Sequence, residues 1–160
     1  MEIYNLTTKI LVYSIDEYSQ DIKKLIEDAK LAAKRAYAPY SGFRVGAAVL
    51  LSNGETITGN NQENAAYPSG LCAERVAMLA ANSLYPDIPV EAIAIAAYSG
   101  DDYTSMPCYP CGSCRQTLLE IENRFDKPFK IIMYGKDKIY EVASIQELLP
   151  LSFGKDFLDK

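Results

Sequence analysis

The sequence predicts an α/β fold in which helices cover both faces of a mixed β-sheet. Three observations lead to this prediction. Residues 15–37 carry apolar side chains at helical spacing, residues 90–98 form a near-continuous apolar run typical of a strand buried on both faces, and helical and strand-like segments alternate along the chain. The chain has 160 residues, of which 49% are hydrophobic, which is typical of one globular domain spanning residues 1–160.

The first helix is expected over residues 15–37, because Pro39 blocks its continuation. Residues 43–51 and 55–59 are expected to pair as a hairpin around the turn Asn53-Gly54. The remaining expected elements are a helix over 73–84, a strand over 90–98, a polar loop over 99–105, a helix over 112–125, strands over 129–134 and 139–142, and a short helix over 144–149. Ser144 and Glu147 have the spacing of a capping box, and residues 1–13 are expected to contribute an N-terminal edge strand.

Charge and hydropathy exclude several classes of partner. The net charge is −5 and no cluster of Lys or Arg stands out, whereas nucleic-acid binding requires a basic surface. The longest apolar run near the N-terminus, residues 10–13, is too short for a signal peptide or a membrane span. We therefore expect a cytoplasmic protein that acts on a small uncharged substrate, with no nucleic-acid partner and no membrane association.

Four cysteines and no histidine define the candidate chemistry. Because cytosolic thiols stay reduced, these cysteines indicate metal binding or catalysis. Cys111 and Cys114 are three residues apart at the expected start of one helix, and Cys72 lies at the start of another. Helix N-termini favour thiolates, and sulfur favours zinc over magnesium or calcium. Three thiolates would leave one tetrahedral position of zinc open, as in a catalytic site.

Glu74 follows Cys72 by two residues, so its carboxylate is expected beside the metal without ligating it. There it can take a proton from a water molecule on zinc and return it elsewhere. The pattern alone leaves alternatives open. Cys108 could act as a fourth ligand and close a purely structural site, a Cys-x-x-Cys pair also serves redox chemistry, and Glu74 could be a solvated residue of the first helical turn.

Three further stretches carry a resemblance to a known family: residues 38–48 (APYSGFRVGAA), 61–65 (NQENA) and 148–154 (LLPLSFG). Together with the two cysteine motifs, they make the chain resemble the small homotetrameric cytidine deaminases with three cysteine ligands. The resemblance implies an α/β/α sandwich with a five-stranded mixed sheet, one Zn²⁺ per subunit, and active sites shared between the subunits of a homotetramer. It implies hydrolytic deamination of cytidine and 2′-deoxycytidine to uridine and 2′-deoxyuridine, with release of ammonia, in pyrimidine salvage.

The resemblance also assigns roles to individual residues. It implies Cys72, Cys111 and Cys114 as zinc ligands, Glu74 as the catalytic acid–base, Asn61 and Glu63 at the ribose 3′-hydroxyl, Phe43 against the nucleoside, the Ala73 backbone N–H at the pyrimidine, Tyr67 and Phe153 in a neighbouring subunit's pocket, and Arg75 as a donor to the cysteine sulfurs. The chain departs from the family at Tyr109-Pro110-Cys111, where Ser-Pro-Cys is usual, and at the extra thiol of Cys108.

The second candidate activity is deamination of a different base or nucleoside, by a blasticidin-type or a deoxycytidylate deaminase. A nucleotide deaminase needs cationic contacts to phosphate and usually a histidine ligand. The chain has no histidine, and no such cationic contact is evident in the sequence. The C-terminal stretch over residues 148–154 also favours the cytidine group.

Overall fold

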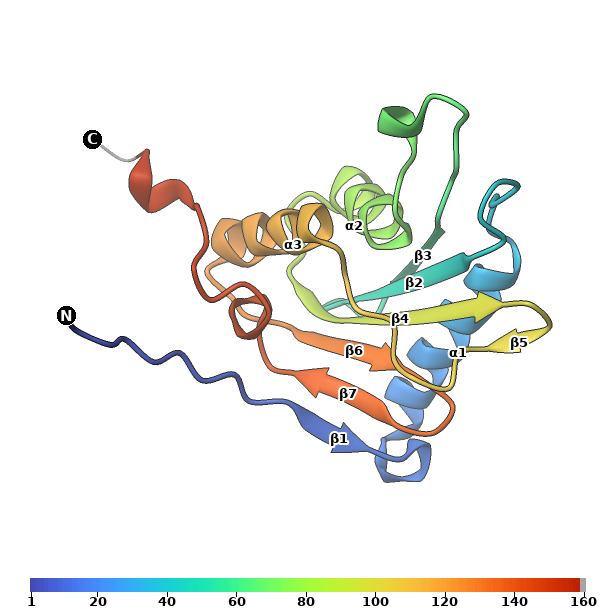
Figure 1. Ribbon diagram of the computed structural model, residues 1–160, viewed down its shortest axis with the longest axis horizontal. Coiled ribbons are helices and arrows are strands. Elements are labelled where there is room, and N and C mark those ends of the chain that lie inside the picture. Colours follow the sequence, from blue (N-terminus) through green and yellow to red (C-terminus); the bar gives the residue numbers. More distant parts are fainter. Residues whose placement is uncertain (159–160) are drawn as a thin grey trace.

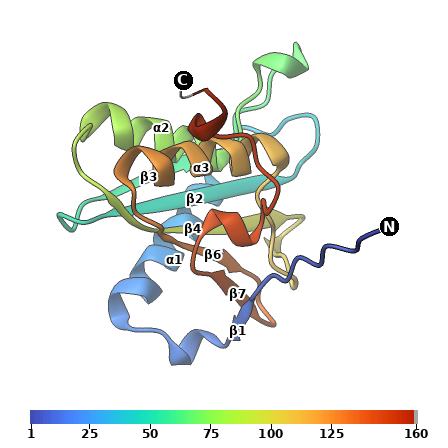
Figure 2. The ribbon, with the colours of Figure 1, turned by 90° about the vertical axis from the view of Figure 1, so that its left-hand side faces the viewer.

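The computed structural model describes residues 1–158. A mixed sheet lies at the centre, with helix α1 on one face and helices α2 and α3 on the other (Figures 1 and 2). The helices are α1 Gln20–Lys34, α2 Ala73–Leu84 and α3 Gly112–Phe125. The strands are β1 Leu11–Tyr13, β2 Arg44–Leu51, β3 Thr56–Asn60, β4 Val90–Ser99, β5 Asp102–Tyr103, β6 Lys130–Tyr134 and β7 Ile139–Val142. Within these described residues, no helix combines the length and apolar character needed to cross a bilayer.

The strand order is β1-β7-β6-β4-β2-β3, with β5 paired to β4. Strands β4 and β6 pair in parallel and the other neighbours pair antiparallel, so the predicted mixed sheet is confirmed. A parallel pair requires a long crossover, which α3 supplies here. The expected five strands are present as β2, β3, β4, β6 and β7, and the two short strands β1 and β5 extend the sheet to seven.

Strand β5 forms inside residues 99–105, which were expected to be a loop. Gly100 adopts a φ of +65°, which permits the tight turn after β4. Tyr103 then lies opposite Tyr98, and their rings pack edge to face with centroids 5.2 Å apart. This aromatic pair stabilises a hairpin that the polar composition of the segment does not reveal.

Each face of the sheet packs against its own helical layer. On β4, Ile93 and Ile95 belong to the core under α2 and α3, whereas Ala92 and Ala94 belong to the core under α1. Because successive residues of a strand point to opposite faces, this alternation confirms that β4 is buried on both sides. The small residues facing α1 let that helix approach closely.

Glycines allow two helices to rest directly on the sheet. A Cβ at Gly46 would lie 2.1 Å from the carbonyl oxygen of Ala29 in α1. A Cβ at Gly59 would lie 2.4 Å from the backbone nitrogen of Ala77 in α2. The position of α2, and with it the position of Cys72 at its start, therefore depends on the bare backbone of β3.

Helix α1 is shorter than the residues 15–37 that were expected. A 3-10 turn, Ile15–Glu17, comes first, and Glu17 accepts a hydrogen bond from the Ser14 backbone N–H at 2.7 Å. Tyr18 is extended, so α1 proper starts only at Gln20, after Ser19. Apolar spacing continues through both segments, which explains why it predicted a single longer helix.

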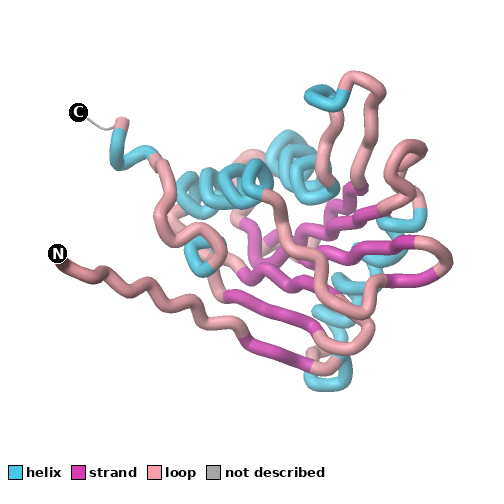
Figure 3. Tube along the Cα trace, viewed as in Figure 1, coloured by secondary structure: helices cyan, strands magenta, loops and turns pink. Residues whose placement is uncertain are grey.

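The N-terminal segment contacts the 3-10 turn Ile145–Glu147, which follows β7. The oxygen of Ser144 accepts from the Gln146 N–H at 3.1 Å, so the predicted cap is confirmed. The reciprocal half of the capping box is wrong, because Glu147 accepts from the backbone N–H of Lys9 at 2.8 Å. This bond ties down the N-terminal segment, which runs without regular structure up to β1 (Figure 3).

Candidate active site

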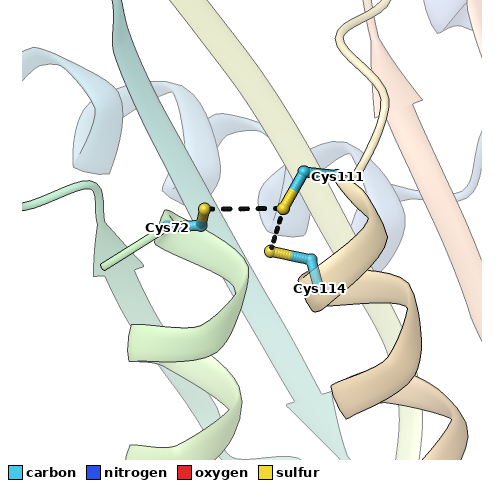
Figure 4. A group of neighbouring side chains, drawn as sticks. All are labelled: Cys72, Cys111 and Cys114. Carbon is cyan, nitrogen blue, oxygen red and sulfur yellow. Dashed lines mark hydrogen bonds between the residues drawn. The ribbon is translucent and has the colours of Figure 1, made fainter. Parts of the chain in front are cut away.

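Two helix N-termini bring three cysteines together (Figure 4). Cys72 occupies the N-cap position of α2, Cys111 occupies that of α3, and Cys114 lies buried in the first turn of α3. The sulfur of Cys111 is 3.7 Å from that of Cys72 and 3.5 Å from that of Cys114. All three sulfurs lie within 4.8 Å of one another.

This arrangement fits a zinc ion. With Zn–S bonds of about 2.3 Å, the sulfurs of a tetrahedral site lie about 3.8 Å apart, close to the separations observed. Cys108 is not part of the cluster formed by the described residues, and its sulfur lies 4.0 Å from the carbonyl oxygen of Tyr109. Three protein ligands and a fourth open position are typical of catalytic zinc, whereas the closed four-cysteine alternative would require Cys108 to join the cluster.

The electrostatics of the cluster favour metal binding at Cys72. Hydrogen bonds from Cys114 and Cys111, and the nearby charge of Arg75, lower the pKa of Cys72 to about 6 although burial opposes this. The same sharing of a proton, together with burial, raises the pKa of Cys114. Burial, reinforced by the charges of Glu74 and Cys72, raises the pKa of Cys108 to about 11. Cys72 therefore loses its proton easily and can bind a metal as a thiolate, whereas Cys108 keeps its proton.

Glu74 is a buried carboxylate in the wall of the same site. It is 5% exposed and lies in the first turn of α2, where the helix N-terminus favours negative charge. Burial raises its pKa, and the charge of Cys72 adds to the effect. A carboxyl group with a raised pKa can both accept and return a proton, which is the property required of a general acid–base.

A cavity of about 610 Å³ opens beside the cysteines and Glu74, a size typical of small-molecule sites. It brings together most of the residues singled out in the sequence. The wall includes Phe43, Asn61, Glu63, Tyr67, Cys72, Ala73, Glu74 and Cys111. Other lining residues are Tyr40, Ser41, Val45, Gln62, Asn64, Gly70, Leu71, Cys108 and Tyr109.

Asn61 and Glu63 hold the loop that carries Phe43. Asn61 accepts from the Val45 N–H at 2.7 Å and donates to the Phe43 carbonyl at 3.0 Å. Glu63 accepts from the Tyr40 N–H at 2.8 Å, and also from the hydroxyl of Ser41. These hydrogen bonds keep the pKa of Glu63 below its ordinary value, so it remains a carboxylate in the cavity wall.

Three residues singled out in the sequence lie outside the cavity lining: Cys114, Arg75 and Phe153. Arg75 makes no hydrogen bond to a cysteine sulfur within the described chain, and its effect on Cys72 is through charge. Phe153 is 58% exposed and stacks on Phe157, while its carbonyl accepts from Gln116 at 2.8 Å.

Arg115 is the fourth residue of α3 and holds the segment that leads into Cys111. It donates to the carbonyl of Pro110 at 2.8 Å and to that of Leu148 at 2.6 Å. The sequence reasoning did not identify Tyr40, Ser41 or the cavity-lining role of Tyr109, because residues of these types are common in loops and carry no spacing signal.

Comparisons with known proteins agree with this geometry. Residues 19–126 match the family described as "Cytidine and deoxycytidylate deaminase zinc-binding region". Cytidine deaminase of Halalkalibacterium halodurans is 39% identical over 133 residues, covering 83% of this chain and 94% of the relative. Cytidine deaminase of Sporosarcina psychrophila is 38% identical over 138 residues, covering 86% and 95%. The crystal structure of cytidine deaminase from Burkholderia pseudomallei matches with a TM-score of 0.71 and 36% identity, over 81% of this chain and 97% of that one.

The fold and the three-sulfur site together define a zinc-binding deaminase. More particularly, the chain belongs to the cytidine and deoxycytidylate deaminase family, whose zinc-binding region spans about two thirds of its length.

Proposed function

We infer that this chain is a zinc-dependent cytidine deaminase, which hydrolyses cytidine and 2′-deoxycytidine to uridine and 2′-deoxyuridine and releases ammonia. The observation that carries this inference is the placement of a buried carboxylate, Glu74, beside three converging thiols in a cavity of nucleoside size. The family match supports the same reaction.

Cys72, Cys111 and Cys114 would hold one zinc ion per subunit. When bound, zinc supplies a Lewis acid that lowers the pKa of a coordinated water toward about 7. The chain contributes the charge balance around it. Three thiolates outweigh the +2 charge of the ion, and the two helix N-termini together with Arg75 offset the excess negative charge.

Glu74 moves the protons of the reaction. We propose that its carboxylate takes a proton from the attacking water and delivers it to N3 of the cytosine ring. It then helps to protonate the amino group at C4, which leaves as ammonia. The raised pKa and the burial of Glu74 support this role, because proton transfer is most effective when the pKa lies near the working pH.

The opposite end of the cavity would bind the sugar. Glu63, Asn61 and Phe43 line the cavity, and we propose that Glu63 and Asn61 bind the ribose 3′-hydroxyl while Phe43 packs on the nucleoside. Ala73, at the start of α2, would offer its backbone N–H to the pyrimidine. No Lys or Arg lines the cavity within the described residues, which favours a nucleoside over a nucleotide as substrate.

We further propose that the enzyme is a cytosolic homotetramer with shared active sites. Tyr67 is 76% exposed and Phe153 is 58% exposed, so both large aromatic side chains are available to a neighbouring subunit. Reduced thiols at the metal site suit the cytosol. Light scattering coupled to gel filtration would measure the assembly, and a monomer that retains full activity would contradict shared sites.

The experiment that tests the function is an absorbance assay on cytidine before and after removal of zinc. We expect uridine and ammonia to form in equal amounts, the activity to disappear on chelation, and added zinc to restore it. Cys111→Ser serves as a variant with a weakened site, and Cys108→Ser as a matched control that leaves the three ligands in place. Zinc-loaded protein that acts on no nucleoside would refute the assignment.

A further inference from the structure

The segment between β5 and α3 forms one wall of the cavity, and the proposed reaction assigns no role to its side chains. Residues 104–109 (TSMPCY) lead into Pro110 and Cys111, and two of them, Cys108 and Tyr109, line the cavity. Neither residue is needed to hold zinc or to move a proton.

The backbone of this wall is fixed against the turn between β6 and β7 (Figure 1). The N–H of Lys136 donates to the carbonyl of Thr104 at 3.0 Å, and the N–H of Asp137 donates to that of Ser105 at 3.1 Å. At Gly135, a Cβ would lie 2.6 Å from the nitrogen of Pro107, so the two segments touch backbone to backbone. The wall therefore has little freedom to move away from a bound ligand.

The two lining side chains are also held in place. The ring of Tyr109 stacks on that of Tyr140 in β7, with centroids 6.2 Å apart and an angle of 10° between the planes. The ammonium group of Lys138 lies 5.3 Å from the centroid of the Tyr140 ring. Cys108 is half-buried, and its sulfur lies 4.0 Å from the carbonyl oxygen of Tyr109. It presents a small, weakly polar side chain to the cavity.

The chemistry of the substrate indicates which of its atoms meets this wall. If the proposed function holds, C4 of the pyrimidine faces the three cysteines and N3 faces Glu74. The other ring neighbour of C4 is C5, so the C5 edge must face a part of the wall near the cysteines other than Glu74. Cys108 and Tyr109 come directly before Pro110 and Cys111 in the chain and line the same cavity as Cys111 and Glu74.

We propose that Cys108 and Tyr109 determine which substituents the enzyme accepts at C5 of the pyrimidine. A fixed wall with a sulfur and an aromatic ring leaves room for hydrogen but restricts a methyl group. Replacing either side chain by a smaller one creates space at that position. In an apolar pocket, a mismatch of one methyl group changes specificity by about 10-fold to 200-fold.

The test compares kcat/KM on cytidine with kcat/KM on 5-methylcytidine for the zinc-loaded enzyme. In Cys108→Ala and in Tyr109→Ser, we expect the ratio of 5-methylcytidine to cytidine to rise by about 10-fold. Met106→Ala is the matched control, because Met106 lies in the same segment but outside the cavity lining. Its ratio should equal that of the unmodified enzyme.

The outcomes separate this proposal from the proposed function. If the unmodified enzyme has no activity on cytidine, the function itself fails. If both variants retain zinc and act on cytidine with an unchanged ratio, the wall does not select at C5 and the proposal is overturned. If both variants lose zinc, the wall supports the metal site instead, which also overturns it. If Tyr109→Ser alone loses zinc, the ratio measured for Cys108→Ala decides whether the wall selects at C5.

Discussion

Glu122 fixes the far end of the helix that presents two of the metal ligands, and its replacement by Ala should be strongly destabilising. The side chain is 5% exposed and accepts three hydrogen bonds. The backbone N–H groups of Phe129 and Ile145 donate at 3.2 Å and 3.0 Å, and the Ser144 hydroxyl donates at 2.7 Å. In Glu122→Ala the two buried N–H groups lose their partner at about 1–3 kcal/mol each, so the free energy of unfolding should fall by about 2–6 kcal/mol.

Glu122→Gln is the matched control, because it keeps one oxygen for both N–H groups, which donate to the same carboxylate oxygen in the native side chain. Its amide nitrogen can donate to Ser144, and we expect a loss of about 1 kcal/mol. Urea unfolding followed by circular dichroism at fixed protein and zinc concentrations measures both variants. If the Gln variant is as unstable as the Ala variant, or the Ala variant loses less than about 1 kcal/mol, the hydrogen bonds do not carry the stability.

Three further predictions concern the site. Glu74→Gln should bind zinc normally but lose about 10²–10⁴-fold in kcat, and a variant with unchanged kcat would exclude Glu74 as the acid–base. Gly59→Ala should lose about 1–3 kcal/mol or more of stability and part of its zinc, since its Cβ would meet Ala77 at 2.4 Å. Hydrogen bonds from Ser41 and Tyr40 lower the pKa of Glu63 from 4.5. The stabilisation of the folded state by the ionised Glu63 carboxylate is therefore complete above pH 4.5, and it disappears as the pH falls through the lowered pKa. The difference in Tm between the unmodified enzyme and Glu63→Gln should therefore be largest above pH 4.5 and narrow as the pH falls further, and a constant difference would contradict this.

Much of the fold followed from short-range pattern. Helix α2 has the bounds expected from the sequence, and α3 agrees with the expected range, because each begins at a cysteine motif and ends before a residue or loop that cannot continue it. The long apolar run of β4 correctly indicated a strand covered on both faces. Helix α1 was predicted too long, because apolar spacing does not register the extended backbone at Tyr18.

Some features of the site could also be predicted from local sequence pattern, and others could not. The cysteine spacing predicted the cluster of three sulfurs that the structure contains, because side chains within one helical turn have predictable directions. The stack of Tyr109 on Tyr140 and the hydrogen bond between Lys9 and Glu147 depend on contacts between distant parts of the chain. No local pattern encodes them, and they had to be seen in the structure.

The three sulfurs come from two helices, so metal binding depends on the tertiary structure. Cys72 and Cys111 are 39 residues apart, and the central strand β4 lies between them in the chain. An unfolded chain offers the ion only the local thiols of Cys108, Cys111 and Cys114, whereas the folded chain brings Cys72 to Cys111 and Cys114. Metal affinity is therefore coupled to the packing of α2 and α3 on the sheet, so that even distant damage to that packing would release the ion.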